Sequence, residues 1–206
     1  MVIGIIDYRT GNSRSVSYAF DRLGLANRLV TSPGECTGVD RYVLPGVGSA
    51  RVTMESLRDK GWDAHLEQVV RGDSVPFLGI CVGLQVLLEH SDEGDVECLG
   101  WIPGAVRHFD RSVERVPHMG WNEVTTRGNH PFAASLRPGG HYYFVNSYYA
   151  VPTDPSTVAG ETTYGQPFAA VLAKDNVVAT QFHTEKSATD GLALLRAFAT
   201  GWSEES

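Results

Sequence analysis

The chain has 206 residues, of which 42% are hydrophobic and 20% are charged, a balance typical of a soluble globular protein. Its formal net charge of -7, with no Lys- and Arg-rich run interleaved with aromatic residues, argues against a nucleic-acid-binding protein. No apolar stretch approaches the ~20 residues that a membrane-spanning helix needs. Met1 leads into an apolar segment without a basic region or a cleavage site, so we expect one cytoplasmic domain over residues 1–206.

The first half of the chain alternates short apolar runs with amphipathic stretches. Strands are expected at residues 2–6, 41–44 and 75–80, and helices at 15–23, in the region up to 70, and at 83–90. Such βα repetition predicts a parallel sheet with helices on both faces. Ligands of such sheets bind beyond the carboxyl ends of the strands, where Cys81 and the turn at 45–48 are expected.

The second half has a different pattern. Apolar runs at 101–109, 121–125, 142–149 and 176–182 are separated by Gly, Pro and Asn turns and predict strands of an antiparallel or mixed sheet. A final helix is expected at 189–198, with Leu192, Leu195 and Phe198 on one face. The tail at 203–206 is expected to be disordered.

Cys81 lies between two glycines at the end of the strand expected at 75–80. The pattern Gly79-x-Cys81-x-Gly83 matches the strand-turn-helix elbow that exposes a nucleophile, and a following helix would favour the thiolate. The alternative is an inert buried cysteine, which we expect for Cys36 and Cys98. The three cysteines form no Cys-x-x-Cys pair, and their odd number argues against a disulfide framework.

A thiol nucleophile needs a base and a group that orients the base. His183 and Glu185 follow the last expected strand as His-x-Glu, so both side chains would leave the same face if the extended conformation continues. By itself this pair is also typical of a strand-end histidine beside a surface glutamate.

An oxyanion at the attacked carbon needs preorganised N–H donors. The residue after the nucleophile, Val82, is one expected source, and the loop containing Val47 and Gly48 is another. The alternative for this loop is an ordinary strand-to-helix turn. It does not match the dinucleotide fingerprint, because the third glycine would fall at Arg51.

Nothing in the sequence predicts a metal ion or a cofactor. The seven histidines form no His-x-x-x-His or His-Glu-x-x-His pattern and are interpreted as structural or surface residues. The acidic run at 91–95 is interpreted as a solvated helix exit.

Three segments, at 45–48, 79–85 and 182–187, resemble the class I (triad type) glutamine amidotransferases. Segments at 7–12, 117–122, 143–148 and 185–187 resemble, within that family, the glutaminase subunits of imidazole glycerol phosphate synthases. The matches span nearly the whole chain. The resemblance implies a single amidotransferase domain with an α/β, flavodoxin-like fold, in which a central mixed, mostly parallel sheet has helices on both faces and an antiparallel extension in the C-terminal half.

The resemblance also implies an activity, the hydrolysis of glutamine to glutamate and ammonia by a Cys-His-Glu triad. Cys81 would attack the side-chain amide and His183 would protonate the departing ammonia. Gln85, Ser147 and Tyr148 would bind glutamine.

Family members form a heterodimer with a (β/α)8-barrel synthase or cyclase subunit, which carries ammonia to an imidazole precursor in histidine biosynthesis. Tyr143 and Lys186 match positions on the docking face of that family. The family members are poor glutaminases until the synthase is liganded, and the loop around Val47 is implicated in completing the oxyanion hole.

The chain departs from the family pattern at Arg9, Ala50, Asn146 and Thr184. None of these positions removes a triad group, but Thr184 replaces a proline whose fixed φ lies between base and orienter, so looser positioning of His183 is expected. Arg9 and Asn146 bear on partner identity and activation more than on the chemistry.

Three other functions compete with this interpretation. A paralogous subunit would supply ammonia to a synthase that amidates sugars for surface polysaccharides. A binding module would keep the fold without catalysis, although the intact triad argues against it. A free-standing cysteine hydrolase would act on γ-glutamyl substrates without a partner.

Overall fold

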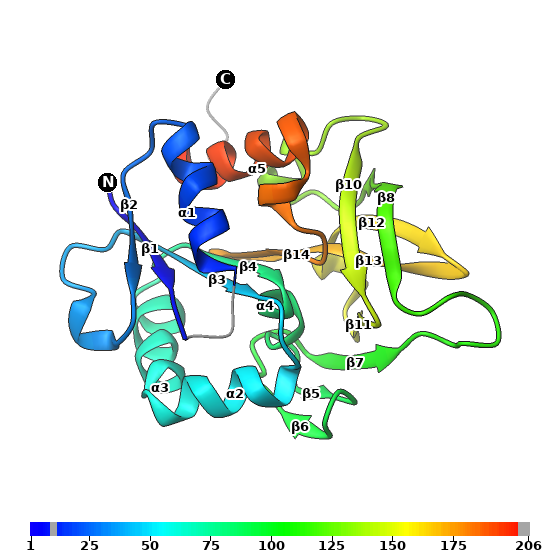
Figure 1. Cartoon of the computed structure of the whole chain (residues 1–206), viewed down its shortest axis with the longest axis horizontal. Helices are drawn as coiled ribbons and strands as arrows, with labels where there is room; N and C mark the ends of the chain where they lie inside the picture. Colours follow the sequence, from blue (N-terminus) through cyan, green and yellow to red (C-terminus); the bar gives the residue numbers. More distant parts are fainter. Residues whose placement is uncertain (9–11, 202–206) are drawn as a thin grey trace.

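The structure is a computed structural model that describes residues 1–8 and 12–201. Arg9 and the tail at 203–206, on which two of the expectations fall, lie outside the described residues. A 12-stranded sheet runs through the molecule in the order β2-β1-β3-β4-β14-β13-β11-β7-β5-β6 (Figure 1), with β12 pairing with β13 and β9. The sheet changes from parallel to antiparallel pairing at β14, which is parallel to β4 and antiparallel to β13.

The parallel part contains β2 (Asn27–Val30), β1 (Ile3–Ile6), β3 (Arg41–Gly46), β4 (Phe77–Cys81) and β14 (Val177–Thr180). These strands are short and almost entirely buried apart from β2, as expected for strands covered on both faces. Parallel pairing brings their carboxyl ends to one edge of the sheet. Cys81 and the segment after Thr180 therefore meet at that edge.

Helices cover both faces of the parallel part. Figure 1 shows α1 (Ser13–Arg22) and α5 (Ala188–Thr200) on one side and α2 (Ala50–Asp59) and α3 (Trp62–Leu66) on the other. A π-helical segment, Glu67–Gly72, continues α3. In α1, Val16, Ala19 and Phe20 are buried, which is the i, i+3, i+4 spacing of an amphipathic helix.

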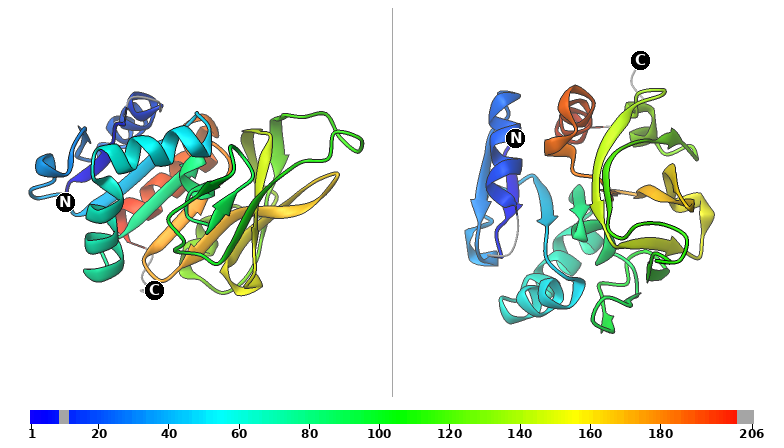
Figure 2. Two further views of the ribbon diagram at one scale, coloured as in Figure 1. Left: turned by 90° about the horizontal axis from the view of Figure 1, so that it is seen from below. Right: turned by 45° about the vertical axis from the view of Figure 1, so that its right-hand side comes forward.

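The antiparallel part lies beside the helix-covered part (Figure 2). Its strands are β5 (His90–Ser91), β6 (Val96–Glu97), β7 (Gly104–His108), β9 (Thr125–Thr126), β11 (Tyr148–Pro152), β12 (Val158–Tyr164) and β13 (Gln166–Lys174). Their pairing is antiparallel except between β5 and β7, which are parallel. A separate two-stranded sheet joins β8 (His118–Glu123) to β10 (His141–Asn146). The α/β fold class and the antiparallel extension expected from the sequence are thus confirmed.

Two expected elements differ in the structure. The strand expected at 142–149 is two strands, because β10 pairs with β8 whereas β11 pairs with β7 and β13 in the large sheet. The helix expected at 83–90 is the short α4 (Val82–Gln85), because the N–H of Glu89 donates to Gly104 O and draws the chain toward β7. Strands β2, β5, β6, β12 and β13 are additional to those expected.

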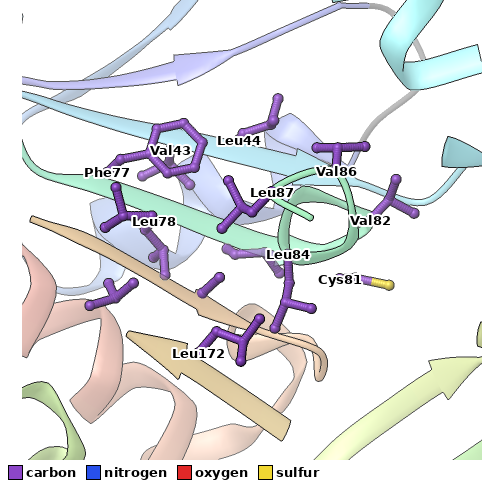
Figure 3. Close-up of a cluster of buried hydrophobic side chains, with 14 of the residues drawn as sticks. Val43, Leu44, Phe77, Leu78, Cys81, Val82, Leu84, Val86, Leu87 and Leu172 are labelled. Carbon is purple, nitrogen blue, oxygen red and sulfur yellow. The ribbon is translucent and has the colours of Figure 1, made fainter. Parts of the chain in front are cut away.

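The hydrophobic core packs around β3, β4 and α4. Figure 3 shows the side chains of Val43, Leu44, Phe77, Leu78 and Leu84 in one buried cluster, with Cys81 at its edge and the sulfur directed away from it. The core therefore holds the backbone on both sides of the cysteine, while the reactive atom lies outside the apolar cluster.

Candidate functional site

Cys81 occupies a strained turn between β4 and α4. Its φ of 58° lies in the left-handed region, which is unusual for a residue with a side chain. A Cβ at Gly79 would collide with the carbonyl of Gly83, and one at Gly83 would collide with the carbonyl of Leu44. The two glycines thus allow the close backbone approach that an elbow requires, as the sequence pattern predicted.

His183 and Glu185 lie just beyond the end of β14, where a single 3-10 turn (Thr184–Lys186) follows the strand. The two side chains are 2% and 1% exposed, and His183 Nδ1 lies 2.9 Å from Glu185 Oε1. Asn12, at the start of α1, donates a hydrogen bond to Glu185 Oε1 and lies 3.4 Å from His183 Nδ1. With Nδ1 engaged by Glu185, the other ring nitrogen is the one that can serve Cys81.

The protonation of His183 reflects these partners. Burial by itself lowers the pKa of the imidazole, but hydrogen bonds to Cys81 and Glu185 outweigh burial and raise the pKa of His183 to about 9. The ring is therefore protonated at neutral pH. A protonated imidazole beside a sulfur can stabilise a thiolate and deliver a proton to a leaving group.

A pocket of about 370 Å³ opens over the sulfur. Of the site residues expected from the sequence, its lining includes Val47, Gly48, Cys81, Val82, Gln85, Ser147, Tyr148, His183 and Lys186. Two expected residues lie elsewhere: Glu185 lies behind His183, and Tyr143 lies on β10 outside the pocket lining. The fold thus gathers into one cavity residues that are distant along the chain.

The backbone around the sulfur provides N–H groups for an oxyanion. Val82 is the first residue of α4, so its N–H has no acceptor four residues earlier within that helix. Val47 and Gly48 follow β3 and also line the pocket, with Val47 52% exposed. A Cβ at Gly46 would contact Val82 Cβ at 2.9 Å, so the two donor segments lie against each other.

Gln85 is held from inside the protein. Its Nε2 donates to the carbonyl of Tyr148 and to Gln181 Oε1, both at 3.1 Å. Because the amide nitrogen uses both protons in these bonds, the amide oxygen is the atom of Gln85 that can accept a hydrogen bond from a ligand. This arrangement is consistent with the expected role of Gln85 in substrate binding.

Glu93 is a pocket residue that the sequence analysis assigned to a solvated helix exit. In the structure it lines the pocket, and its Oε2 accepts the N–H of Ala50 at 2.9 Å. Burial raises the pKa of the Glu93 carboxyl, more than the Ala50 hydrogen bond lowers it. The sequence did not indicate that Glu93 lines the pocket, because Glu93 lies in a run of acidic residues that is typical of a solvated segment. Its neighbour Asp92 pairs with Arg107 at 2.6 Å.

Gln181 and Asn12 are two further residues that the sequence analysis missed. Gln181 is fully buried, and its Nε2 lies 3.8 Å from Cys81 Sγ. The sequence did offer one indication of Gln181, because this polar residue directly follows the four buried residues of β14. A buried amide needs hydrogen-bond partners. Asn12 belongs to the segment at 7–12 that resembles the glutaminase subunits, but its contact with Glu185 depends on the tertiary structure.

The departures from the family pattern keep the site intact where the structure describes them. Thr184 has a buried Oγ1 without a hydrogen-bond partner in the described chain. His183 nonetheless keeps its backbone anchored, because its N–H donates to Tyr143 O at 2.9 Å and its carbonyl accepts from Ser187 Oγ at 2.6 Å. Asn146 Nδ2 donates to the carbonyl of Tyr148 at 2.9 Å. Two backbone hydrogen bonds thus hold His183 although Thr184 stands where the family pattern has a proline.

An exposed apolar surface lies beside the pocket on the β8–β10 sheet. Met119 and Trp121 are 63% and 53% exposed, and the Trp121 ring lies 5.9 Å from that of Tyr143 across the two strands. We call these three residues the apolar β8–β10 face. Lys186, which is exposed and lines the pocket, follows His183 in the chain.

Two further properties of the described residues concern metal ions and membranes. Within residues 1–8 and 12–201, no three His, Cys, Asp or Glu side chains form a group that could hold a metal ion. No helix in the described part of the chain combines the length and apolarity needed to cross a membrane.

Comparison with known proteins finds relatives that all belong to one family. The family model of class-I glutamine amidotransferases matches residues 5–201. The chain is 46% identical to the imidazole glycerol phosphate synthase subunit HisH of Nitrosococcus oceani, over 96% of each chain. It is 44% identical to the subunit HisH of Pseudomonas putida over 95% of each chain, and 40% identical to that of Dehalococcoides mccartyi over 96% of each.

Solved structures share the fold at lower sequence identity. A crystal structure of a glutamine amidotransferase matches with a TM-score of 0.74 at 20% identity, covering 96% of this chain and 97% of the other. A chain of PurLQS from Thermotoga maritima matches with a TM-score of 0.73 at 16% identity, covering 97% of each chain. The chain therefore belongs to the class-I glutamine amidotransferases and, within them, to the family of the HisH subunits of imidazole glycerol phosphate synthase.

Proposed function

We propose that the chain is the glutaminase subunit of an imidazole glycerol phosphate synthase, releasing ammonia from glutamine for a synthase partner in histidine biosynthesis. The observation that carries this proposal is that Cys81 and His183 line one pocket with Glu185 behind His183, on a chain whose relatives are HisH subunits. We further propose that residues 1–206 act as one amidotransferase domain, since the 12-stranded sheet joins strands from both halves of the chain, and that the protein is cytoplasmic.

The proposed reaction begins with the sulfur of Cys81 and the protonated ring of His183. The thiolate attacks the side-chain carbonyl carbon of glutamine, and a C–S bond forms as the carbonyl oxygen becomes an oxyanion. When the oxyanion collapses, the C–N bond breaks and His183 gives its proton to the departing nitrogen, so ammonia and a γ-glutamyl thioester remain. The raised pKa of His183, about 9, supports this role because the ring holds its proton at neutral pH.

Water then completes the cycle. Neutral His183 takes a proton from a water molecule, the resulting hydroxide attacks the thioester carbon, and the C–S bond breaks to release glutamate and regenerate the thiolate. Glu185 stabilises the protonated ring and fixes its orientation through the 2.9 Å contact to Nδ1. The N–H of Val82, with the loop of Val47 and Gly48, would stabilise the oxyanion in both steps.

The pocket offers groups for the amino-acid end of glutamine. The oxygen of Gln85 and the carboxylate of Glu93 can accept hydrogen bonds from the ammonium group, which would also favour the charged form of Glu93. Ser147 and Tyr148 line the pocket on the side of β11 and would contact the amino-acid end of the substrate.

The proposed partner is a (β/α)8-barrel synthase subunit that docks on the apolar β8–β10 face. Exposed Met119 and Trp121 would bury apolar surface there together with Tyr143, and Lys186 would place a positive charge where this face meets the pocket. A partner on this face would cover the pocket mouth, so ammonia could pass to it without entering bulk solvent.

Glutamate release tests the proposal. The purified chain is assayed alone, with the synthase subunit, and with the synthase subunit plus its nucleotide-linked precursor. We expect turnover to rise strongly only in the last mixture. Stimulation only by a sugar-amidating synthase would identify the paralogous function, and strong turnover without any partner would identify a free-standing hydrolase; either result would refute the proposal.

A further inference from the structure

A row of buried amide groups lies beneath the glutamine pocket and ends at the sulfur of Cys81. Gln181 is its centre: its Oε1 accepts a hydrogen bond from Gln85 Nε2 at 3.1 Å, and its own Nε2 lies 3.8 Å from Cys81 Sγ. The side chain of Gln181 has no exposed surface. Its position one residue after β14 is fixed by a 2.8 Å hydrogen bond from its backbone N–H to Ala170 O.

The direction of the Gln181 amide follows from its neighbour. Gln85 presents an N–H group, which is only a donor, so the oxygen of Gln181 must face Gln85. The NH₂ group of Gln181 must then face the sulfur. A buried amide that lacked these partners would destabilise the fold, so the arrangement is specified by hydrogen bonding rather than by shape alone.

The row continues to the segment that lines the substrate pocket. Gln85 Nε2 also donates to the carbonyl of Tyr148 at 3.1 Å, and Asn146 Nδ2 donates to the same carbonyl at 2.9 Å. An unbroken series of hydrogen bonds therefore joins Asn146 and Tyr148, through Gln85 and Gln181, to the sulfur. A change in the position of any member alters the partner of the next.

We propose that Gln181 is a positioning residue for Cys81, which directs an N–H toward the thiolate and ties the sulfur to the glutamine-binding segment. The inference rests on the proposed function, in which Cys81 is the glutaminase nucleophile. Gln181 is not itself part of the pocket lining; it acts through two lining residues, the sulfur of Cys81 on one side and Gln85 on the other. The Asn146 end of the row governs substrate affinity, whereas the Gln181 end governs the reactivity of the sulfur.

The test uses Gln181→Met, which keeps the length of the side chain but removes both hydrogen-bonding groups. Measured in the complex with the synthase subunit and its precursor, kcat should fall by about 10- to 100-fold, the scale of one lost hydrogen bond to a charged group. KM for glutamine should change far less. Alkylation of Cys81 by iodoacetamide, followed by mass spectrometry of the Cys81 peptide, should slow in the free subunit.

Two further variants separate positioning from general disturbance of the strand. Thr180→Val alters the preceding, equally buried residue, whose hydroxyl bonds to the carbonyl of Phe182, and should leave kcat and alkylation near those of the unsubstituted protein. Asn146→Ala should raise KM with a smaller effect on kcat, because it removes one of the two donors to the Tyr148 carbonyl but leaves the amide facing the sulfur.

Gln181→Glu adds a pH readout and serves if the Met variant does not fold. An ionised carboxylate has no proton to donate, whereas a protonated one does. The kcat of the Glu variant relative to the unsubstituted protein should therefore rise as the pH is lowered from 9 to 6. A constant ratio, or equal losses in the Thr180→Val control, would overturn the inference.

The same experiment separates this inference from the proposed function. If the unsubstituted complex does not release glutamate from glutamine, the proposed function fails. If it does, while Gln181→Met retains full kcat and full alkylation rate, only the inference about Gln181 fails.

Discussion

Two buried histidines, one in each part of the molecule, have opposite electrostatic environments. His183, at the edge of the parallel part, faces Cys81 and Glu185, and the pKa of its imidazole rises to about 9. His118, on β8, is 4% exposed, and burial lowers the pKa of its imidazole to about 4. Burial disfavours the charged ring at both sites, so the partners decide the sign of the shift.

The surroundings of His118 explain the difference. Its ring stacks on those of Tyr164 and Phe144 at centroid distances of 4.1 and 4.9 Å, and its Nδ1 is buried without a hydrogen-bond partner in the described chain. Its Nε2 lies 3.4 Å from Asn122 Nδ2. Two histidines of similar burial therefore differ in charge, one being a protonated ring beside a sulfur and a carboxylate and the other a neutral aromatic core residue.

Removing the sulfur should produce the largest effect. Cys81→Ala takes away the nucleophile and one of the two partners that raise the pKa of His183, so glutaminase activity should fall by about 10⁵-fold or more. The synthase reaction supplied with an ammonium salt should stay intact, because the pocket produces ammonia and does not use it. Residual glutamine-dependent turnover near the original rate would contradict the role of Cys81.

Removing the carboxylate should weaken activity without abolishing it. In Glu185→Gln, kcat should fall by about 10²–10⁴-fold, because the orienting group contributes less than the nucleophile. The pKa of His183, followed by NMR of the imidazole protons, should drop toward the value of an ordinary histidine. A pKa that stays near 9 in this variant would show that Cys81 alone sets the protonation of His183.

The stability of Glu185→Gln should also respond differently to pH. Because the folded pKa of His183 lies above that of the unfolded chain, the stability from its partners is present below about pH 6.5 and lost as the pH rises through about 9. Denaturant unfolding at several pH values should show that the free energy of unfolding falls less steeply between pH 6.5 and 9 in the variant than in the unsubstituted protein.

His118 should show the reverse pH dependence. The pKa of His118 in the folded protein, about 4, lies below that of a histidine in the unfolded chain. As the pH falls from about 6.5 to 4, the unfolded chain therefore binds a proton at this residue that the folded protein does not bind. This uptake should cost up to ~3 kcal/mol of unfolding free energy, since each pKa unit corresponds to about 1.4 kcal/mol. His118→Phe should reduce the slope of stability against pH in this window, and an unchanged slope would exclude His118 as its source.

The smallest effect concerns Thr184, which lies between His183 and Glu185. Thr184→Pro should raise the free energy of unfolding by about 0.5–1 kcal/mol, because it restricts the unfolded chain. It also removes a buried hydroxyl without a partner, and the φ of -83° and ψ of 103° at His183 are compatible with a following proline. Thermal unfolding measures the change. A destabilised variant would mean that the proline ring does not fit the turn at position 184.

The sequence predicted the parts of the site that depend on local chemistry. Two glycines around Cys81 indicated a close-packed elbow, because the required backbone approach leaves no room for a Cβ. Alternating apolar and amphipathic segments indicated a parallel sheet, whose carboxyl ends must share one edge, so His183 could be placed near Cys81. The antiparallel extension was also indicated by the spacing of turns in the second half.

Contacts between distant segments were decided by the tertiary structure alone. Glu93 looked like part of a solvated acidic run, yet the return of the chain toward β7 places it in the pocket wall. The expected strand at 142–149 divides because its two ends pair with different sheets, which a hydrophobic pattern does not reveal. The hydrogen bonds of Gln181 and the opposite pKa shifts of His183 and His118 likewise depend on which side chains packing brings into contact, because burial and partners are properties of the folded state.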